Sequence, residues 1–236
     1  HLKEGDLKEI RLGQNPRIYD KNGKLLGIVA GVTNRTVVPS RRIPDVLKDA
    51  TVAIEDKRFY EHHGIDWRRT MSAAMYTFSG DRQGGSTITQ QLARNLYPDG
   101  IGRAPTLTRK LKEAITALKI EAVYSKDQIL ETYLNTVPFL YNAFGVEMAA
   151  RTYFGKSADR LDMLESATLI GMLKANSTYN PVLNPERALA RRNTVLGQMN
   201  KYGTLKPDAY NWLKRQPLRV DFELQTTPLG AAPHFS

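Results

Sequence analysis

From residue 43 onward, apolar residues return every three or four positions, which is the spacing of one face of an α-helix. Pro44 opens the first stripe, Gly80 follows the second, and Thr106 precedes the third. The stripes consist of Ile43, Val46, Leu47, Ala50 and Ile54, then Trp67, Met71, Ala74, Met75 and Phe78, then Leu107, Leu111, Ala114, Ile115, Leu118 and Ala122. The spacing therefore predicts a mainly α chain.

Further helices are expected along the rest of the chain. Ser125 with Gln128 has the pattern of a capping box, which predicts a helix start there. Similar patterns predict helices near 143–154, 162–174, 186–201 and 207–214. We expect residues 41–215 to form one domain.

The two ends of the chain lack this helical period. Residues 17–38 are β-like around Asn22-Gly23, a strong hairpin signal, so residues 1–40 are predicted to be a linker and a small β-hairpin. Residues 216–236 contain Pro and Gly without a helical period and are predicted to be a linker toward a transpeptidase domain.

The charge and composition of the chain limit the kinds of binding partner and chemistry that it can have. The 34 Lys and Arg against 24 Asp and Glu give a net charge of +10, which favours an anionic partner such as a phosphorylated substrate, an acidic membrane or nucleic acid. The absence of cysteine excludes disulfides and thiol nucleophiles. No apolar run reaches the ~20 residues of a membrane span, so any membrane anchor is expected outside these 236 residues.

Four short segments carry candidate chemistry. Glu55, at the end of the first predicted helix, is a candidate general base, although an acidic pair at a helix end is more often only solvated. The adjacent His62 and His63 could suggest a metal site, but consecutive ring nitrogens rarely converge on one ion without a third ligand nearby. The run GGSTITQQLARN, residues 84–95, can place helix N–H groups and neutral polar side chains against an anion or a sugar.

The third segment contains Arg109, Lys110 and Glu113, which share one helix face. They form either an exposed salt-bridge ladder or a phosphate clamp around an embedded carboxylate. Glu131 and Asn135 lie one turn apart on a later amphipathic helix.

Taken together, five motifs resemble those of the family 51 glycosyltransferases, which form the peptidoglycan glycosyltransferase domains of class A penicillin-binding proteins and their monofunctional relatives. The resemblance covers roughly residues 40–215. The motifs are Glu55-Asp56-x-x-Phe59-x-x-His62-x-Gly64, Gly85-Ser86-Thr87-Ile88-Thr89-Gln90-Gln91-Leu92-x-Arg94-Asn95, Arg109-Lys110-x-x-Glu113, Lys126-x-x-Ile129-Leu130-Glu131-x-Tyr133-Leu134-Asn135 and Arg192-x-x-Val195-Leu196-x-x-Met199.

The resemblance implies a lysozyme-like α fold of two lobes. It also implies an enzyme that polymerises lipid II on the extracytoplasmic face of the bacterial cytoplasmic membrane. The growing glycan on undecaprenyl pyrophosphate is the donor, and the 4-hydroxyl of an incoming lipid II is the acceptor. A β-1,4 glycan strand is the expected product.

The resemblance also assigns roles to residues. Glu55 is the expected base, and Glu113 the second catalytic acidic residue, which positions the donor or assists pyrophosphate departure. No cofactor is required, although a divalent cation (Mg²⁺ or Mn²⁺) at the donor pyrophosphate, with Glu113 as a ligand, is compatible with the family. The substrate-binding residues expected are Ser86, Thr87, Gln90, Gln91, Arg94, Asn95, Arg103, Arg109, Lys110 and Asn135.

Two positions depart from the family pattern. Pro105 stands where relatives carry a basic residue, and Arg103 is expected to replace it in part. Arg94 stands where relatives often carry Lys. Residues 66–79 are expected to contact the membrane, the alternative being that Met71, Met75 and their neighbours belong to the core.

Two other functions remain open from the sequence. A lysozyme-like hydrolase or lytic transglycosylase would share the fold, but the basic residues beside Glu113 argue against it. A nucleic-acid binder would suit the net charge of +10. Its aromatic residues would be expected among Lys and Arg, whereas here they lie mostly on apolar stripes.

Overall fold

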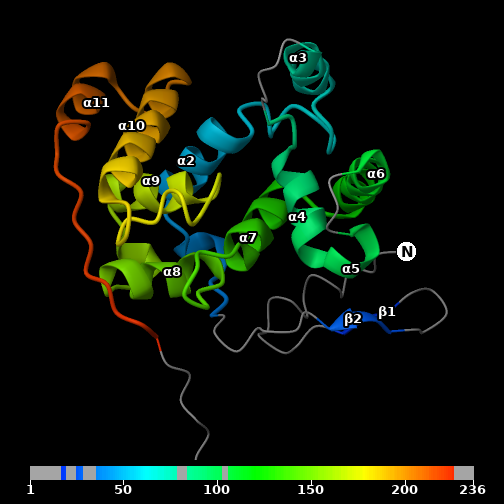
Figure 1. Cartoon of the computed structure of the whole chain (residues 1–236), viewed down its shortest axis with the longest axis horizontal. Helices are drawn as coiled ribbons and strands as arrows, with labels where there is room; N and C mark the ends of the chain where they lie inside the picture. Colours follow the sequence, from blue (N-terminus) through cyan, green and yellow to red (C-terminus); the bar gives the residue numbers. More distant parts are fainter. Residues whose placement is uncertain (1–16, 20–24, 29–35, 79–83, 103–105, 226–236) are drawn as a thin grey trace, which may run out of the picture.

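The structure, a computed structural model, describes residues 17–19, 25–28, 36–78, 84–102 and 106–225. It is mainly helical, as predicted (Figure 1). The elements are β1 (Arg17–Tyr19), β2 (Leu25–Ile28), η2 (Ser40–Arg42), α2 (Asp45–Glu55), α3 (Trp67–Phe78), α4 (Ile88–Leu96), α5 (Pro98–Ile101), α6 (Leu107–Val123), α7 (Lys126–Thr136), α8 (Gly145–Phe154), η3 (Ala158–Arg160), α9 (Met163–Met172), α10 (Pro185–Lys201) and α11 (Pro207–Leu213).

Side-chain caps fix where several helices begin. The predicted capping box of Ser125 and Gln128 is confirmed at the start of α7, and Thr87 with Gln90 forms another at the start of α4. Thr106 accepts a hydrogen bond from the backbone N–H of Arg109 at the start of α6. Local sequence therefore sets the start of α4, α6 and α7, which carry residues of the second, third and fourth motifs.

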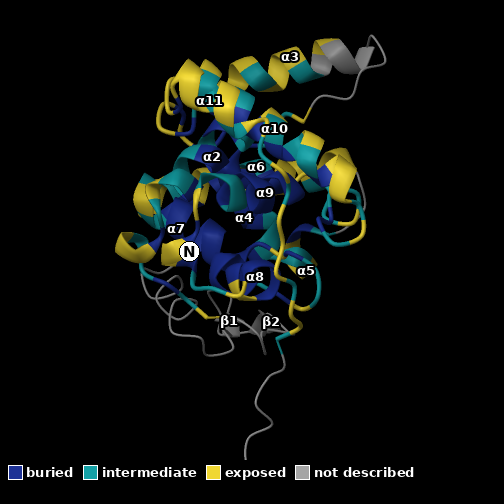
Figure 2. Ribbon diagram, turned by 90° about the vertical axis from the view of Figure 1, so that its left-hand side faces the viewer, coloured by how far each residue is buried: buried dark blue, intermediate teal, exposed yellow. Residues whose placement is uncertain are grey.

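The core lies among α2, α4, α7, α8, α9 and α10, whose facing side chains are buried (Figure 2). Leu47 of α2, Leu92 of α4 and Leu134 of α7 are each 0% exposed. Helix α3 stands away from this body in both views (Figures 1 and 2). Its residues Trp67, Met71 and Met75 are exposed. No helix in the described ranges is both long and apolar enough to span a bilayer.

Helix α6 is turned opposite to what its apolar stripe suggests. Leu107 and Leu111 are 87% and 61% exposed, whereas Glu113 is 0% exposed. The helix packs against α4 through the side that carries Glu113. The reading of residues 109–113 as an exposed salt-bridge ladder is therefore wrong, because the carboxylate is embedded.

The connection from α7 to α8 depends on Gly145. Its φ of +81° is in the left-handed region, and a Cβ atom there would lie 2.6 Å from the carbonyl oxygen of Asn135. This glycine allows α8 to start directly against the end of α7.

Strands β1 and β2 pair antiparallel. The Asn22-Gly23 turn expected between them lies outside the described residues, so the hairpin stays a prediction. Residues 217–225 follow α11 and run along α8, where the N–H groups of Asp221 and Glu223 donate to the carbonyls of Tyr153 and Thr152 (Figure 1).

Candidate active site

Glu55 is the last residue of α2, and its two carboxylate oxygens have different surroundings. Oε2 accepts a hydrogen bond from Nε2 of Gln91 on α4 at 3.2 Å. Oε1 is buried and has no hydrogen-bond partner among the described residues. Burial raises the pKa of Glu55, and Asp56 raises it further, against the lowering effects of the Gln91 hydrogen bond and of Arg191 and Arg69. The geometry fits a general base with one free oxygen.

Asp56, the neighbour of Glu55, ties the end of α2 to the start of α4. Its Oδ2 accepts from the backbone N–H of Ile88 at 3.1 Å and lies 2.7 Å from Nε2 of His62. Nδ1 of His62 accepts from the N–H of Gly64, so the ring proton is on Nε2 and points to Asp56. The histidine therefore has a structural role, and the described residues include no cluster of acidic and histidine side chains that could hold a metal ion.

Arg69 of α3 adds a second tie, which sequence reasoning missed. Its Nη1 donates to the backbone carbonyl of Glu55, and its Nε donates to the carbonyl of Gly84 at 2.9 Å. From the sequence, this residue is expected only as part of the helix predicted to contact the membrane. No local pattern reveals the contact, because it joins segments 14 and 15 residues apart.

Glu113 lies in a cluster of cations contributed by α4 and α6. Its Oε2 is 3.0 Å from Nζ of Lys110, and its Oε1 is 3.4 Å from Nε of Arg109 and 3.8 Å from Nη1 of Arg94. Nζ of Lys110 also donates to Oγ of Ser86 at 2.6 Å. The second and third sequence motifs thus meet in space.

This cluster does not supply the ligand set of a divalent metal ion from the protein alone, and a metal ion shared with the donor pyrophosphate stays a prediction. Mg²⁺ and Mn²⁺ prefer several oxygen ligands. Glu113 supplies the carboxylate, and the side chains that surround it are three cations, Arg94, Arg109 and Lys110. Such a set suits an anion with several negative oxygens, such as a pyrophosphate.

Helix α4 joins the two glutamates. Gln91 faces Glu55, and Arg94, three residues later on the same helix, faces Glu113. Residues three apart on a helix are neighbours on its surface. The base and the cationic cluster therefore lie along one side of α4.

Other predicted site residues have structural contacts. Oγ1 of Thr87 donates to the carbonyl of Gly64 at 2.7 Å and caps α4 together with Gln90. Asn135 uses its side-chain amide to bind both backbone groups of Val38 and the carbonyl of Glu131. Their roles toward a substrate stay predictions.

The two remaining predicted residues are less defined. Asn95 is half-buried in the last turn of α4. Arg103 lies outside the described residues, so its expected role in place of a basic residue at Pro105 stays a prediction.

Two residues near Glu55 were not assigned as site residues from the sequence. The hydroxyl of Tyr133 on α7 donates to Oε1 of Gln91 at 3.0 Å. Arg191 of α10 lowers the pKa of Glu55 through its charge. Tyr133 belongs to the fourth motif but was not given a role, and Arg191 is the neighbour of the motif residue Arg192.

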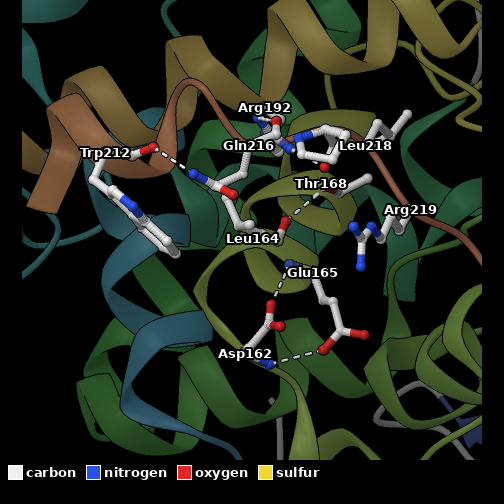
Figure 3. Close-up of a pocket in the computed structure, with 10 residues that line it drawn as sticks. Asp162, Leu164, Glu165, Thr168, Arg192, Trp212, Gln216, Leu218 and Arg219 are labelled. Atoms are coloured by element: carbon white, nitrogen blue, oxygen red, sulfur yellow. Dashed lines mark hydrogen bonds between the residues drawn. The ribbon is translucent and has the colours of Figure 1, made fainter.

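Two hollows lie away from the cationic cluster. One, of about 570 Å³, lies beside the end of α2 and is lined by Ala53, Ile54, Lys57, Arg58, Asp66, Arg68, Arg69, Ser72, Gln198 and Tyr202. The other, of about 270 Å³, lies between α9 and the segment after α11 (Figure 3). There, Asp162 and Glu165 cap α9, and Gln216 donates to the carbonyl of Trp212, so these groups serve the fold.

Comparison with known proteins agrees with the geometry. A model of the family described as transglycosylase matches residues 22–200. Similar proteins include penicillin-binding protein 1A of Aquifex aeolicus, 43% identical over 89% of this chain and 29% of its own, and penicillin-binding protein 1A of Escherichia coli, 40% identical over 98% and 27%. Penicillin-binding protein 1A/1B of Bacillus subtilis is 42% identical over 89% of this chain and 23% of its own.

The chain thus spans less than a third of the length of these relatives. The family match, in contrast, extends over most of the chain and includes Glu55, Glu113 and the helix between them. The protein belongs to the transglycosylase family, the family 51 glycosyltransferases that its motifs resemble.

Proposed function

We propose that the protein is a peptidoglycan glycosyltransferase that polymerises lipid II into β-1,4 glycan strands with inversion at the donor sugar. The observation that carries the proposal is the contrast between two carboxylates along α4. Glu55 is desolvated and has one free oxygen, whereas Glu113 is embedded among three cations. One site accepts a proton and the other receives negative charge.

The reaction follows from this division. The 4-hydroxyl of the acceptor loses its proton to Oε1 of Glu55 while its oxygen attacks the anomeric carbon of the donor. The bond from that carbon to the pyrophosphate breaks, and the electron pair leaves with the pyrophosphate. Arg94, Arg109 and Lys110 stabilise this charge, and no residue has to protonate the leaving group.

The acceptor is proposed to enter through the 570 Å³ hollow beside α2. Lys57, Arg68 and Arg69 line it, and Arg69 contacts the backbone of Glu55. An acceptor pyrophosphate held there by charge would bring its sugar toward the base. The lining also includes Tyr202 and Gln198, which suit the polar and ring surfaces of a sugar.

Membrane contact is proposed through α3. Trp67, Met71 and Met75 are 67%, 67% and 75% exposed, at a spacing that puts them on one face. Leu107 and Leu111 make a second exposed apolar stripe on α6. We place this enzyme on the extracytoplasmic face of the bacterial cytoplasmic membrane, with the helices arranged as the two lobes of a lysozyme-like fold.

The hydrolase alternative is not favoured. Hydrolysis of a glycan needs an acid that protonates an alkoxide leaving group. Glu113 lies 3.0 Å from Lys110 and close to Arg94 and Arg109, and such a cluster of cations suits an anionic leaving group such as a pyrophosphate rather than the protonation of an alkoxide.

The proposal is tested with lipid II in detergent micelles. Wild type should convert lipid II to long glycan, and Glu55→Gln should bind lipid II but polymerise it ~10²- to 10⁴-fold more slowly. Purified glycan and DNA serve as controls that should be neither cleaved nor bound specifically. Cleavage of glycan without polymer formation would establish the hydrolase instead.

A further inference from the structure

We infer that Tyr133 is a positioning residue, which orients the side-chain amide of Gln91 so that it holds Oε2 of Glu55 and leaves Oε1 to take the acceptor proton. The inference deepens the proposed function and rests on it. Three side chains from three helices form the chain of contacts: Tyr133 of α7, Gln91 of α4 and Glu55 of α2.

The direction of each hydrogen bond follows from chemistry. The Tyr133 hydroxyl donates to Oε1 of Gln91 at 3.0 Å, and Nε2 of Gln91 donates to Oε2 of Glu55 at 3.2 Å. If the amide turned over, its carbonyl oxygen would face the carboxylate with no hydrogen between them, and the two acceptors would repel. A tyrosine donor behind the amide favours the productive orientation.

Tyr133 can donate to Gln91 because its hydroxyl keeps its proton. Its side chain is 1% exposed, so water does not compete for the hydroxyl. Burial raises the pKa of Tyr133 well above its usual value, and the negative charge of Glu55 raises it further. The phenol therefore keeps its proton at every pH at which the enzyme works.

The amide of Gln91 selects between the two oxygens of Glu55. Oε2 is held by Gln91, whereas Oε1 is buried and has no hydrogen-bond partner among the described residues. A buried oxygen without a partner is costly, and a hydrogen bond from the acceptor hydroxyl would remove that cost at Oε1. Oε1 is thus the oxygen left for the acceptor hydroxyl.

The charged groups around Glu55 act on its pKa independently of the hydrogen-bond relay, by which we mean the contacts from Tyr133 through Gln91 to Glu55. They are Arg69 of α3, Arg191 of α10 and the neighbouring Asp56, while Arg94 of α4 acts on Tyr133. Because Gln91 and the Tyr133 phenol are neutral, losing the relay removes only one hydrogen bond that favours the ionised form of Glu55.

The test is Tyr133→Phe, which removes the hydroxyl and keeps the ring. Lipid II polymerisation should show kcat lowered about tenfold with KM changed less than about twofold, as expected when a general base is misoriented. The acidic limb of the kcat profile should move to higher pH, because the Glu55 carboxylate loses a stabilising donor.

Tyr153→Phe is the matched control. Tyr153 is also buried, and its hydroxyl donates to the carbonyl of Phe139, in a contact that involves neither Gln91 nor Glu55. Both variants lose one buried hydrogen bond and some thermal stability, but only Tyr133→Phe should move the acidic limb. Equal pH profiles in the two variants would reduce Tyr133 to a structural residue.

Gln91→Ala keeps the test decisive if Tyr133→Phe folds poorly. Gln91 is only half-buried, and its replacement should move the acidic limb in the same direction. The double variant should match Gln91→Ala, because Tyr133 acts through the amide. One outcome would overturn the relay and leave the proposed function intact. In that outcome, wild type polymerises lipid II and Glu55→Gln does not, but the acidic limb of the kcat profile of Gln91→Ala lies where it does in wild type.

Discussion

The buried carboxylate of Glu113 lies 3.0 Å from the ammonium group of Lys110, which also reaches the hydroxyl of Ser86. One lysine thus links the glycine-rich run to the carboxylate on α6. The Glu113 carboxylate holds the side chains of Lys110, Arg109 and Arg94 close together. Without this carboxylate, the three positive charges would repel one another and move apart.

We therefore expect Glu113→Gln to disturb the donor site. The donor should bind more weakly, and kcat/KM for lipid II should fall by about 10²-fold, since charge stabilisation of the leaving group is typically worth this much. Because the cations neutralise the pyrophosphate directly, EDTA should leave wild-type turnover largely unchanged. Polymerisation assays with and without EDTA check both expectations.

Glu121→Gln is the control on the same helix. Its carboxylate accepts from Thr89 and Lys126, away from Glu113. This variant should lose some thermal stability and keep its kcat. A loss of activity equal to that of Glu113→Gln would mean that α6 responds as a whole and that Glu113 has no special role.

The raised pKa of Glu55 also predicts a trade-off between activity and stability. The folded state holds the Glu55 proton more tightly than the unfolded state, because burial raises its pKa. Stability from this group is then present below the unfolded pKa and is lost as pH rises through the folded pKa. Glu55→Gln should therefore unfold at a higher temperature than wild type at pH 7 to 8, and lose this advantage toward pH 4.

Glu147→Gln gives the opposite comparison. Its carboxylate accepts from the N–H of Ala158 at 2.8 Å and pairs with Arg151 at 3.0 Å. Removing this charge should lower the melting temperature at neutral pH. Thermal melts of both variants across the pH range decide the matter, and a destabilised Glu55→Gln at pH 8 would contradict the cost assigned to the buried carboxylate.

Local sequence was sufficient for the parts of the fold that depend on neighbouring residues. The helix starts at Thr87, Thr106 and Ser125 follow from capping, and a motif resemblance found Glu55 and Glu113. The orientation of α6 could not be predicted, because an apolar stripe normally faces inward. Here the embedded Glu113, compensated by cations of two helices, reverses that preference.

Long-range hydrogen bonds account for the other differences. Tyr133 and Gln91 are 42 residues apart, and Asn135 reaches Val38 across 97 residues. A side chain on a helical stripe can be apolar packing or a hydrogen-bond donor, and only the tertiary partner decides which. For this reason the sequence could place Tyr133 on a helix but not in the site.

If the acceptor binds in the hollow beside α2, substitutions there should change KM for lipid II without changing kcat. Lys57 and Arg68 are exposed cations that line it, and neither contacts the Glu55 carboxylate in the described structure. Replacing both by Ala should raise KM for lipid II about three- to tenfold with kcat changed less than about twofold, because the lost attraction acts before the transition state.

Replacing Lys206 and Arg187 by Ala removes the same charge from exposed positions outside the hollow. Steady-state kinetics at low and moderate salt should show that only the Lys57 and Arg68 pair changes KM. If both pairs raise KM equally, the net charge of the protein steers the substrate and the hollow has no specific role.

The exposed stripe of α3 makes the membrane proposal testable. Met71 and Met75 are 67% and 75% exposed, which contradicts the alternative that they belong to the core. Substituting both by Asp should weaken binding to vesicles of phosphatidylethanolamine and phosphatidylglycerol about tenfold or more, because two apolar anchors are replaced by charges that the anionic surface repels. The melting temperature should change little, since exposed substitutions typically cost within about 0.5 kcal/mol each.

Leu183→Asp is the control, because Leu183 is 71% exposed and lies between α9 and α10. It should bind vesicles as wild type does; flotation assays in which the Met71 and Met75 variant also binds normally would show that α3 does not enter the lipid surface.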